Sequence, residues 1–134
     1  MPWDCIIVGG GPAGLSAALI LGRVRRRVLV LDAGTPRNHC SASMHGYLTR
    51  DGIPPADFLR TARAELEPYE SVTLLDEEAV DAERADGGFR VRTAGGETLE
   101  GSTLLLATGV VDDVPTIDGI ERFYGRTVHH CPYC

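Results

Sequence analysis

Two groups of residues in this 134-residue chain have the types and spacing that chemistry requires. Cys131-Pro132-Tyr133-Cys134 is a Cys-x-x-Cys pair, and its spacing allows a disulfide to close with acceptable geometry. The segment Gly9–Gly14 carries a G-x-G-x-x-G pattern directly after the apolar run Cys5–Val8, which is typical of a dinucleotide-binding turn. A nucleotide cofactor and a two-electron thiol couple in one chain suggest that electrons pass between them.

Each glycine of the pattern has a separate task. Gly9 permits a tight turn, Gly11 lets the backbone approach a pyrophosphate, and Gly14 allows the next helix to pack closely on the sheet. The N–H groups and the dipole at the start of that helix would hold the phosphates. Asp32, at the end of the second apolar run, can accept hydrogen bonds from a ribose diol. Its charge would repel a 2′-phosphate, so NADP is disfavoured in this pocket.

The elements that position these residues follow from the apolar pattern. Short apolar runs predict buried parallel strands over residues 4–8, 27–31 and 104–107. A helix is expected after the glycines, and its packed face consists of apolar or small residues at helical spacing, namely Leu15, Ala18, Leu19 and Gly22. A second helix is predicted to begin at Pro55 and to end at Pro68, after a long loop over residues 33–54.

From Ser71 the pattern changes to short strand-like segments. Strands are expected over residues 72–75, 79–84, 89–93 and 97–99, with Gly95-Gly96 as a turn. These segments indicate a small antiparallel hairpin sheet, which is foreign to the simple NAD-binding fold and therefore favours FAD. The predicted fold class is α/β, a Rossmann-like parallel sheet with helices on one face and the antiparallel β-hairpin sheet on the other.

Composition disfavours some classes of partner and indicates a cellular location. The net charge of −6 disfavours a nucleic-acid partner or an anionic membrane. No apolar stretch approaches the roughly 18 residues of a membrane span, and no secretory signal is visible. A cytoplasmic location is expected, where thiols are kept reduced. A Cys-x-x-Cys in that compartment indicates a redox or metal-binding pair more than a structural disulfide.

With these parts in order, the chain resembles the two-dinucleotide-binding flavoproteins, specifically the low-molecular-weight bacterial thioredoxin reductases and their relatives. Four motifs carry the resemblance across essentially the whole chain, namely Gly9–Gly14, Asp32-Ala33-Gly34, Leu106-Ala107-Thr108-Gly109 and Cys131-Pro132-Tyr133-Cys134. The resemblance implies the N-terminal FAD-binding part of a thioredoxin reductase-like pyridine nucleotide-disulfide oxidoreductase.

The resemblance also implies roles for individual residues. The residues expected to bind FAD are Gly9, Gly11, Pro12, Ala13, Gly14, Asp32, Ala33, His45, Val80, Ala107, Thr108 and Gly109. Residues 107–109 would touch the cofactor where the chain leaves the domain, and backbone near Val80 would meet the adenine. Cys131 and Cys134 would be the catalytic couple, with Cys134 nearer the flavin and Cys131 as the thiol that exchanges with the substrate.

The loop segments Thr35–His39 and Met44–Gly46 are more similar to the branch of the family that includes dithiol oxidases of small-molecule biosynthesis. His45 falls where a flavin-facing polar residue is expected, although a loop histidine is also compatible with a solvent-exposed side chain. The implied partner is a protein disulfide such as thioredoxin, with NADPH as donor, or a small-molecule dithiol, with oxygen as acceptor.

By the same resemblance, residues 1–112 correspond to the N-terminal segment of the FAD-binding domain. Residues 113–134 correspond to a linker that carries the Cys-x-x-Cys toward an NADPH domain absent from this chain. The fold is therefore expected to be incomplete relative to the family. For the complete enzyme the resemblance implies a homodimer.

Two other functions remain open on the sequence. The chain could be a non-catalytic fragment or remnant that binds FAD or ADP and turns nothing over. Alternatively, the two cysteines with His129 or His130 could supply three zinc ligands in a tail module. Only one Cys-x-x-Cys is present, so no metal ligand is assigned.

Overall fold

The computed structural model describes residues 2–133 of the chain. These residues form two compact units. Unit 1 comprises the chain up to Thr35 together with Ala62–Thr108, and unit 2 comprises Pro36–Thr61 together with the chain from Gly109 onward.

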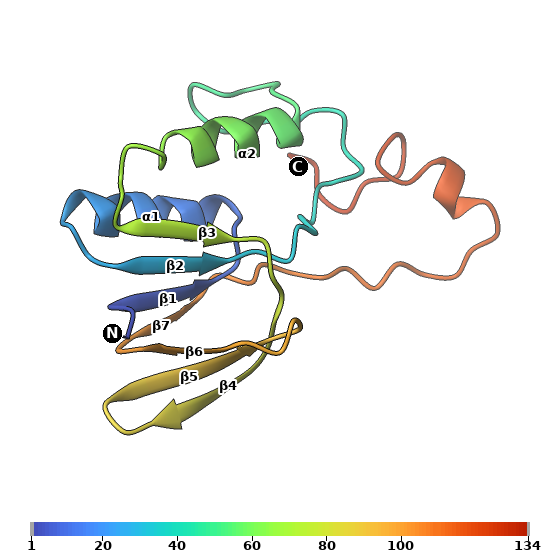
Figure 1. The fold of residues 1–134 in the computed structure, drawn as a ribbon. Coiled ribbons are helices and arrows are strands. Elements are labelled where there is room, and N and C mark those ends of the chain that lie inside the picture. The colour runs from blue at the N-terminus through green and yellow to red at the C-terminus, as the bar shows by residue number, and fades with distance from the viewer. Residues whose placement is uncertain (1, 134) are drawn as a thin grey trace. The chain divides into compact units, whose positions relative to one another are not determined.

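A four-stranded parallel sheet forms the centre of unit 1 (Figure 1). Its strands, in spatial order, are β3 (Val72–Leu75), β2 (Val28–Leu31), β1 (Cys5–Val8) and β7 (Leu104–Leu106). Helix α1 (Pro12–Arg23) joins β1 to β2. β1 and β2 are almost wholly buried apolar runs, as the sequence predicts for strands covered on both faces.

A three-stranded antiparallel sheet completes unit 1. It contains β4 (Ala79–Ala85), β5 (Gly88–Thr93) and β6 (Thr98–Gly101) in sequence order. A bridge between Trp3 and Gly101 joins it to the start of β1. The ladder between β4 and β5 shifts register between Ala79 and Asp81, so Val80 lies at a bulge-like irregularity.

Alternation along the parallel strands gives the sheet two different faces. Ile6 pairs in register with Leu29, and both belong to the core cluster with Val91 of the antiparallel sheet. Ile7, the next residue of β1, points to the opposite face of the sheet, where its side chain lies near Gly14 of α1. Helix α1 and the antiparallel sheet therefore cover opposite faces, which confirms the predicted fold class.

Two predicted elements differ from the structure. Residues 72–75, grouped in the sequence with the antiparallel strands, instead pair in parallel with β2. The second helix, α2 (Pro55–Ala64), ends before the predicted stop at Pro68. There the Leu66 N–H donates to the Arg63 carbonyl oxygen three residues back, so the chain tightens into a turn that buries Leu66 ahead of the proline.

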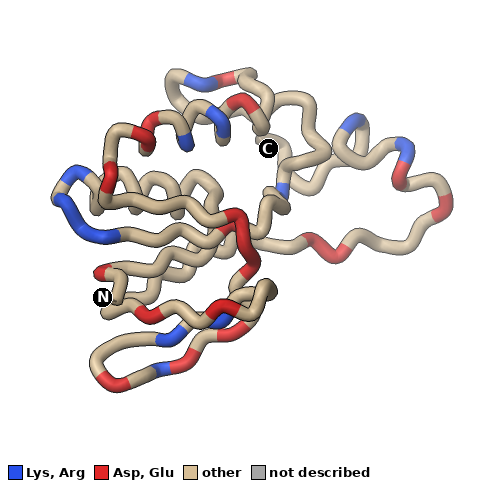
Figure 2. The backbone as a smooth tube through the Cα atoms, viewed as in Figure 1, with Lys and Arg blue, Asp and Glu red and all other residues tan. Residues whose placement is uncertain are grey.

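Arginines gather where α1 turns into β2, as Figure 2 shows. Arg23 lies in the last turn of α1, where a cation complements the negative end of the helix dipole. Arg25 adopts a left-handed conformation with φ of 58°, and its N–H donates to the Gly22 carbonyl oxygen as the helix ends. This basic cluster is thus part of a helix terminus.

The carboxylate of Asp4 ties the starts of β1 and β2 together and should make unit 1 sensitive to acid. Its Oδ2 accepts a 2.8 Å hydrogen bond from the Arg27 backbone N–H. That bond, partly offset by desolvation and helped by the Arg27 and Arg26 charges, lowers the pKa of Asp4.

Because the folded pKa lies below the unfolded value of about 3.9, Asp4 stabilises the fold above that pH. The contribution is lost as the pH falls through the folded pKa. We expect Asp4→Asn, which keeps an acceptor oxygen, to reduce the acid-induced drop in the urea midpoint between neutral pH and about pH 3. An equally steep drop in the variant would contradict this role. Glu70→Gln, at an exposed carboxyl, is the control.

Unit 2 consists mainly of loops, together with the first part of α2 and a short 3-10 helix over Ile120–Arg122. Arg37 donates two hydrogen bonds of 2.8 Å to the carboxylate of Asp112, which joins the first loop of the unit to its last segment. These bonds lower the pKa of Asp112. Tyr47 and Phe58 pack edge to face with their ring centres 5.0 Å apart.

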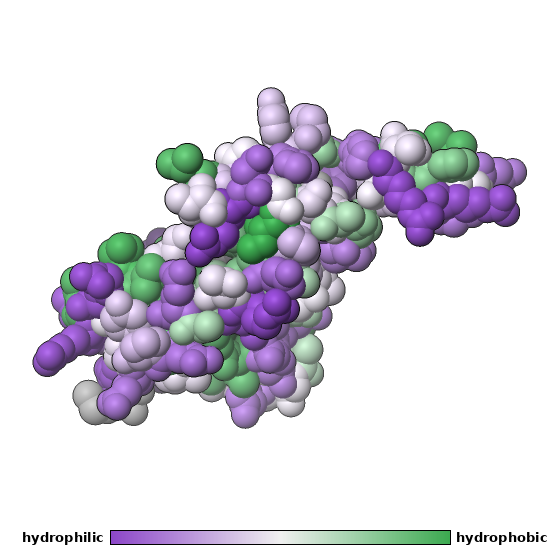
Figure 3. All heavy atoms as spheres, turned by 90° about the horizontal axis from the view of Figure 1, so that it is seen from above, coloured by the Kyte–Doolittle hydropathy of each residue, from purple (hydrophilic) through white to green (hydrophobic). Residues whose placement is uncertain are grey.

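Surface hydropathy is mixed. In Figure 3 the hydrophobic areas are separated by hydrophilic residues on the visible face. Within residues 2–133, none of the helices combines the length and the apolar character needed to cross a membrane.

Candidate dinucleotide site and redox segment

The turn between β1 and α1 depends on two glycines for its shape. Gly9 has φ of 115°, and its N–H donates a 2.8 Å hydrogen bond to the Leu31 carbonyl oxygen of β2. A Cβ at Gly9 would collide with the carbonyl oxygen of Ala107, and a Cβ at Gly14 would collide with that of Gly9. The backbone of the turn, the helix and the end of β7 therefore approach one another as only glycine permits.

Gly11 differs from these two because a Cβ there would meet nothing within 4 Å. It precedes α1 with an extended backbone, and Pro12 occupies the first helical turn. No described side chain caps this helix start by a hydrogen bond, and its first turn has no acidic residue. Open space beside an uncapped helix N-terminus suits a phosphate, so this turn fits the pyrophosphate of a dinucleotide.

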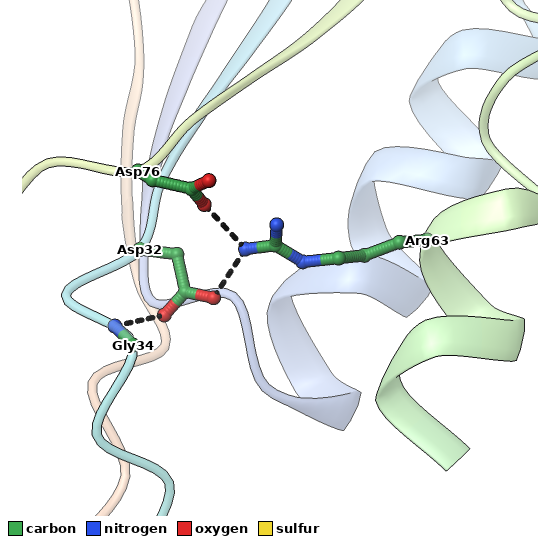
Figure 4. A network of polar contacts seen from close by, with 4 residues as sticks. All are labelled: Asp32, Gly34, Arg63 and Asp76. Atoms are coloured by element: carbon green, nitrogen blue, oxygen red, sulfur yellow. Dashed lines mark hydrogen bonds and ion pairs between the residues drawn. The ribbon is translucent and has the colours of Figure 1, made fainter. Parts of the chain in front are cut away.

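Asp32 lies directly beside the glycine turn. A Cβ at Gly10 would overlap the Asp32 carboxyl carbon, so the missing side chain of Gly10 makes room for this carboxylate. Oδ1 accepts a 3.0 Å hydrogen bond from the Gly34 N–H, and Oδ2 accepts one of 2.6 Å from Arg63. Arg63 also donates to Asp76 at 2.8 Å (Figure 4).

The end of β7 reaches the same turn from the other side. The Ala107 N–H donates to the Val8 carbonyl oxygen at 2.8 Å, and its own carbonyl oxygen lies against Gly9. Thr108 closes unit 1, and Gly109 begins unit 2 with φ of 68°. Val80 is half exposed at the irregularity of β4.

In unit 2, His45 lies beside the Cys-x-x-Cys segment. Its backbone N–H donates a 2.6 Å hydrogen bond to the Tyr133 carbonyl oxygen. Its ring Nε2 lies 3.2 Å from the Ser43 hydroxyl, and Nδ1 lies 3.5 Å from the Asp51 carboxylate. The loop around His45 and the segment around Cys131 together line a hollow of about 350 Å³.

The cysteine pair is described only in part. Cys131 is disulfide-bonded, whereas Cys134 lies outside the described residues. Both ring nitrogens of His130 are buried without a hydrogen-bond partner among the described residues, and the ring lies 5.8 Å from that of Tyr124. Within residues 2–133, no group of three or more His, Cys, Asp or Glu side chains could hold a metal ion.

The structure brings the predicted residues together in two places. Unit 1 holds most of the nucleotide set around one turn, namely Gly9, Gly11, Pro12, Ala13, Gly14, Asp32, Ala33, Ala107 and Thr108. Unit 2 places His45 with Cys131. Sequence reasoning missed Gly10, Arg63 and Asp76. The segment Gly9–Gly14 has one glycine more than the G-x-G-x-x-G pattern requires, and this extra glycine was a signal for Gly10. No sequence pattern singles out Arg63.

A parallel sheet with a glycine-built first turn and an acid after its second strand defines a Rossmann-type dinucleotide-binding domain. A family model described as "Pyridine nucleotide-disulphide oxidoreductase" matches residues 3–134, and the chain belongs to this family.

Individual relatives agree with this assignment. The chain is 40% identical to the thioredoxin reductase aclD of Aspergillus oryzae, over 98% of this chain and 43% of the relative. It is 38% identical to the thioredoxin reductase tcpT of Claviceps purpurea, over 98% and 42%. An oxidoreductase structure from Agrobacterium tumefaciens superposes with a TM-score of 0.93 at 42% identity, covering all of this chain and 45% of that one.

The chain therefore spans less than half the length of these relatives. Its predicted resemblance to the N-terminal part of a thioredoxin reductase-like oxidoreductase is confirmed.

Proposed function

We propose that this chain is the FAD-binding segment of a disulfide/dithiol oxidoreductase, in which electrons pass between the flavin and the Cys131/Cys134 couple. The observation that carries the proposal is the hollow in unit 2, where His45 lies beside Cys131. The family resemblance implies that His45 faces the flavin and that Cys131 exchanges disulfides with the substrate. Their shared hollow is what electron transfer between a flavin and a thiol pair would need.

Unit 1 would hold the adenosine diphosphate part of FAD. The open position at Gly11 and the uncapped start of α1, with Ala13 and Gly14, would receive the pyrophosphate. The Asp32 carboxylate would accept hydrogen bonds from the ribose hydroxyls. Ala33 and the end of β7 at Ala107, Thr108 and Gly109 would border the cofactor. The register irregularity at Val80 would leave backbone groups for the adenine.

Unit 2 would supply the thiol chemistry. FAD, when bound, would supply the flavin with which the thiol pair exchanges its two electrons. Cys131 would exchange with the substrate disulfide or dithiol as a thiolate, because the thiolate is the nucleophile in such exchange. Cys134 would form the intramolecular disulfide that accepts or returns the electron pair. His45 would position the segment through its bond to the Tyr133 carbonyl oxygen.

The remaining parts of the activity belong to the longer protein that the relatives represent. We place residues 1–112 in the FAD-binding domain and residues 113–134 in the linker to an NADPH-binding domain. The substrate would be a protein disulfide of the thioredoxin type or a small-molecule dithiol. The complete enzyme would act as a homodimer in the cytoplasm.

Flavin spectra of wild-type and Cys131→Ser chains test the proposal. Each chain is mixed with FAD, freed of excess cofactor and titrated with dithiothreitol. We expect both to retain FAD with affinities within about twofold, since removing one sulfur leaves the nucleotide contacts intact. Only the wild type should show a flavin band that shifts when its thiols are reduced, because serine cannot form the disulfide.

The alternatives give different results in the same experiment. Retained FAD with no thiol-dependent shift in the wild type would favour the non-catalytic FAD- or ADP-binding fragment. A colourless wild-type protein would contradict FAD binding by this chain. Bound zinc in a stoichiometric amount with no flavin would favour the metal-binding tail. Cys40→Ser, which changes a free thiol elsewhere in unit 2, is the matched control for the cysteine substitution.

A further inference from the structure

Asp32, at the end of β2, belongs to a charge network with Arg63 and Asp76 (Figure 4). One terminal nitrogen of Arg63 donates to Asp32 Oδ2 at 2.6 Å and to Asp76 Oδ1 at 2.8 Å. The side chain of Asp32 is 19% exposed and that of Arg63 is 31% exposed, whereas that of Asp76 is 76% exposed. The inner ion pair is therefore shielded from water, and Asp76 holds the guanidinium from the solvent side.

The network leaves part of the Asp32 carboxylate available. A carboxylate offers about four acceptor positions. Gly34 takes one on Oδ1 and Arg63 takes one on Oδ2. Both oxygens are thus fixed in direction, and each retains one acceptor position. A diol has two hydroxyl donors, which matches the two positions that remain.

Gly10 confines the carboxylate further. The Asp32 carboxyl group occupies the space that a side chain at Gly10 would fill. Hydrogen bonds to Asp76 and, more weakly, to Asp32 raise the pKa of Arg63, so its charge is constant wherever the protein is folded. The guanidinium is permanently charged, and the two N–H donors of its bridging nitrogen lie in fixed directions in the guanidinium plane, whereas the three donors of a lysine ammonium rotate.

We infer that Arg63 is a positioning residue for the ribose of a bound adenine nucleotide, holding the Asp32 carboxylate so that its two remaining acceptor positions receive the ribose hydroxyls. The inference rests on the proposed FAD function, because it assigns Asp32 to the nucleotide. It adds a residue from α2 to a site that is otherwise built from the strand ends and the glycine turn.

Ribose-modified nucleotides separate positioning from a merely structural role. Calorimetric titrations would compare ADP with 2′-deoxy-ADP and 3′-deoxy-ADP on the wild-type, Arg63→Ala and Arg63→Lys chains. We expect the wild type to bind ADP roughly tenfold more tightly than either deoxy analogue, because each analogue loses a hydrogen bond to a charged acceptor. In both variants the preference should fall to about twofold, since the carboxylate is no longer fixed.

Arg60→Ala is the matched control. Arg60 lies on the same helix, pairs only with Asp57 among the described residues and is exposed, so its removal should leave the tenfold preference unchanged. Unfolding midpoints would be measured for every variant. Should Arg63→Ala fail to fold, Arg63→Lys, which keeps the charge, carries the test.

The outcomes distinguish this inference from the proposed function. Loss of the ADP preference in the Arg63 variants, with Arg60→Ala unaffected, supports it. Weaker binding of all three nucleotides with an unchanged ratio would overturn it, because that pattern reports general destabilisation, while the proposed function would stand. Failure of the wild-type chain to bind either ADP or FAD would overturn both.

Discussion

Substituting alanine for Gly14 is expected to destabilise the fold severely, whereas the same substitution at Gly11 should leave the fold intact and weaken FAD binding. A Cβ at Gly14 would collide with the Gly9 carbonyl oxygen and lie 3.2 Å from Ile7 Cγ2. Neither neighbour is a flexible side-chain end, so helix α1 must move off the sheet. Overpacking costs about 1–3 kcal/mol and sometimes more, and the rigid backbone neighbour here favours the upper end, a large part of the roughly 5–15 kcal/mol that stabilises a domain.

Substitution of Gly11 tests the cofactor-binding role of the glycine pattern. Nothing lies within 4 Å of its Cβ position, and its φ of −81° is ordinary for alanine. Alanine is a poorer helix N-cap than glycine, which costs about 0.5–1 kcal/mol. The added methyl group would occupy the space in which the pyrophosphate approaches the backbone. We expect FAD affinity to fall at least about tenfold, roughly 1.4 kcal/mol.

Urea unfolding and FAD titration on the two variants decide between these roles. A Gly14→Ala chain as stable as the wild type would contradict the close approach of α1 to the turn. A Gly11→Ala chain that retains FAD with unchanged affinity would place the pyrophosphate elsewhere. Gly87→Ala is not a suitable control because its φ of 80° strains any side chain. Ser16→Ala, exposed on α1, is suitable.

The glycine turn and its strands were predictable because their signals are local. Strands buried on both faces read as continuous apolar runs, and β1 and β2 have that form. β3 gave a weaker signal. Val72–Leu75 is a four-residue run whose residues are not fully buried, and such a run does not reveal whether it pairs in a parallel or an antiparallel sheet. The pairing of β3 with β2 determines that it lies in the parallel sheet.

The candidate site was predictable only where one segment builds it. Asp32 follows a strand that the sequence marks, so its place beside the glycines follows from parallel pairing. Arg63 comes from a helix thirty-one residues further along and reaches Asp32 only through the path of the chain between them. The meeting of His45 with Cys131 is similar, because both lie in segments without periodic structure and no pattern could place them together.

Leu29→Ala should produce the largest loss of stability among core substitutions that leave the nucleotide residues untouched. Leu29 is 2% exposed and packs in the cluster that joins the parallel sheet to Val91 of the antiparallel sheet. Truncating a buried leucine to alanine costs about 2–5 kcal/mol, from lost apolar burial and the cavity left behind. Ile20→Ala on α1 is the control, since Ile20 is 61% exposed and its truncation should change stability by about 0.5 kcal/mol or less.

Added FAD separates this loss of stability from a loss of binding. A ligand that binds only the folded chain stabilises it by about 2.7 kcal/mol at a hundred times its Kd. Leu29 belongs to the core and is not among the residues proposed to bind the nucleotide. Saturating FAD should therefore raise the stability of the Leu29→Ala and wild-type chains by the same increment. Gly11→Ala should start near wild-type stability and gain much less. Equal increments in Gly11→Ala and the wild type would contradict the role of Gly11 in FAD binding. No increment in Leu29→Ala would contradict a role for Leu29 in core packing alone.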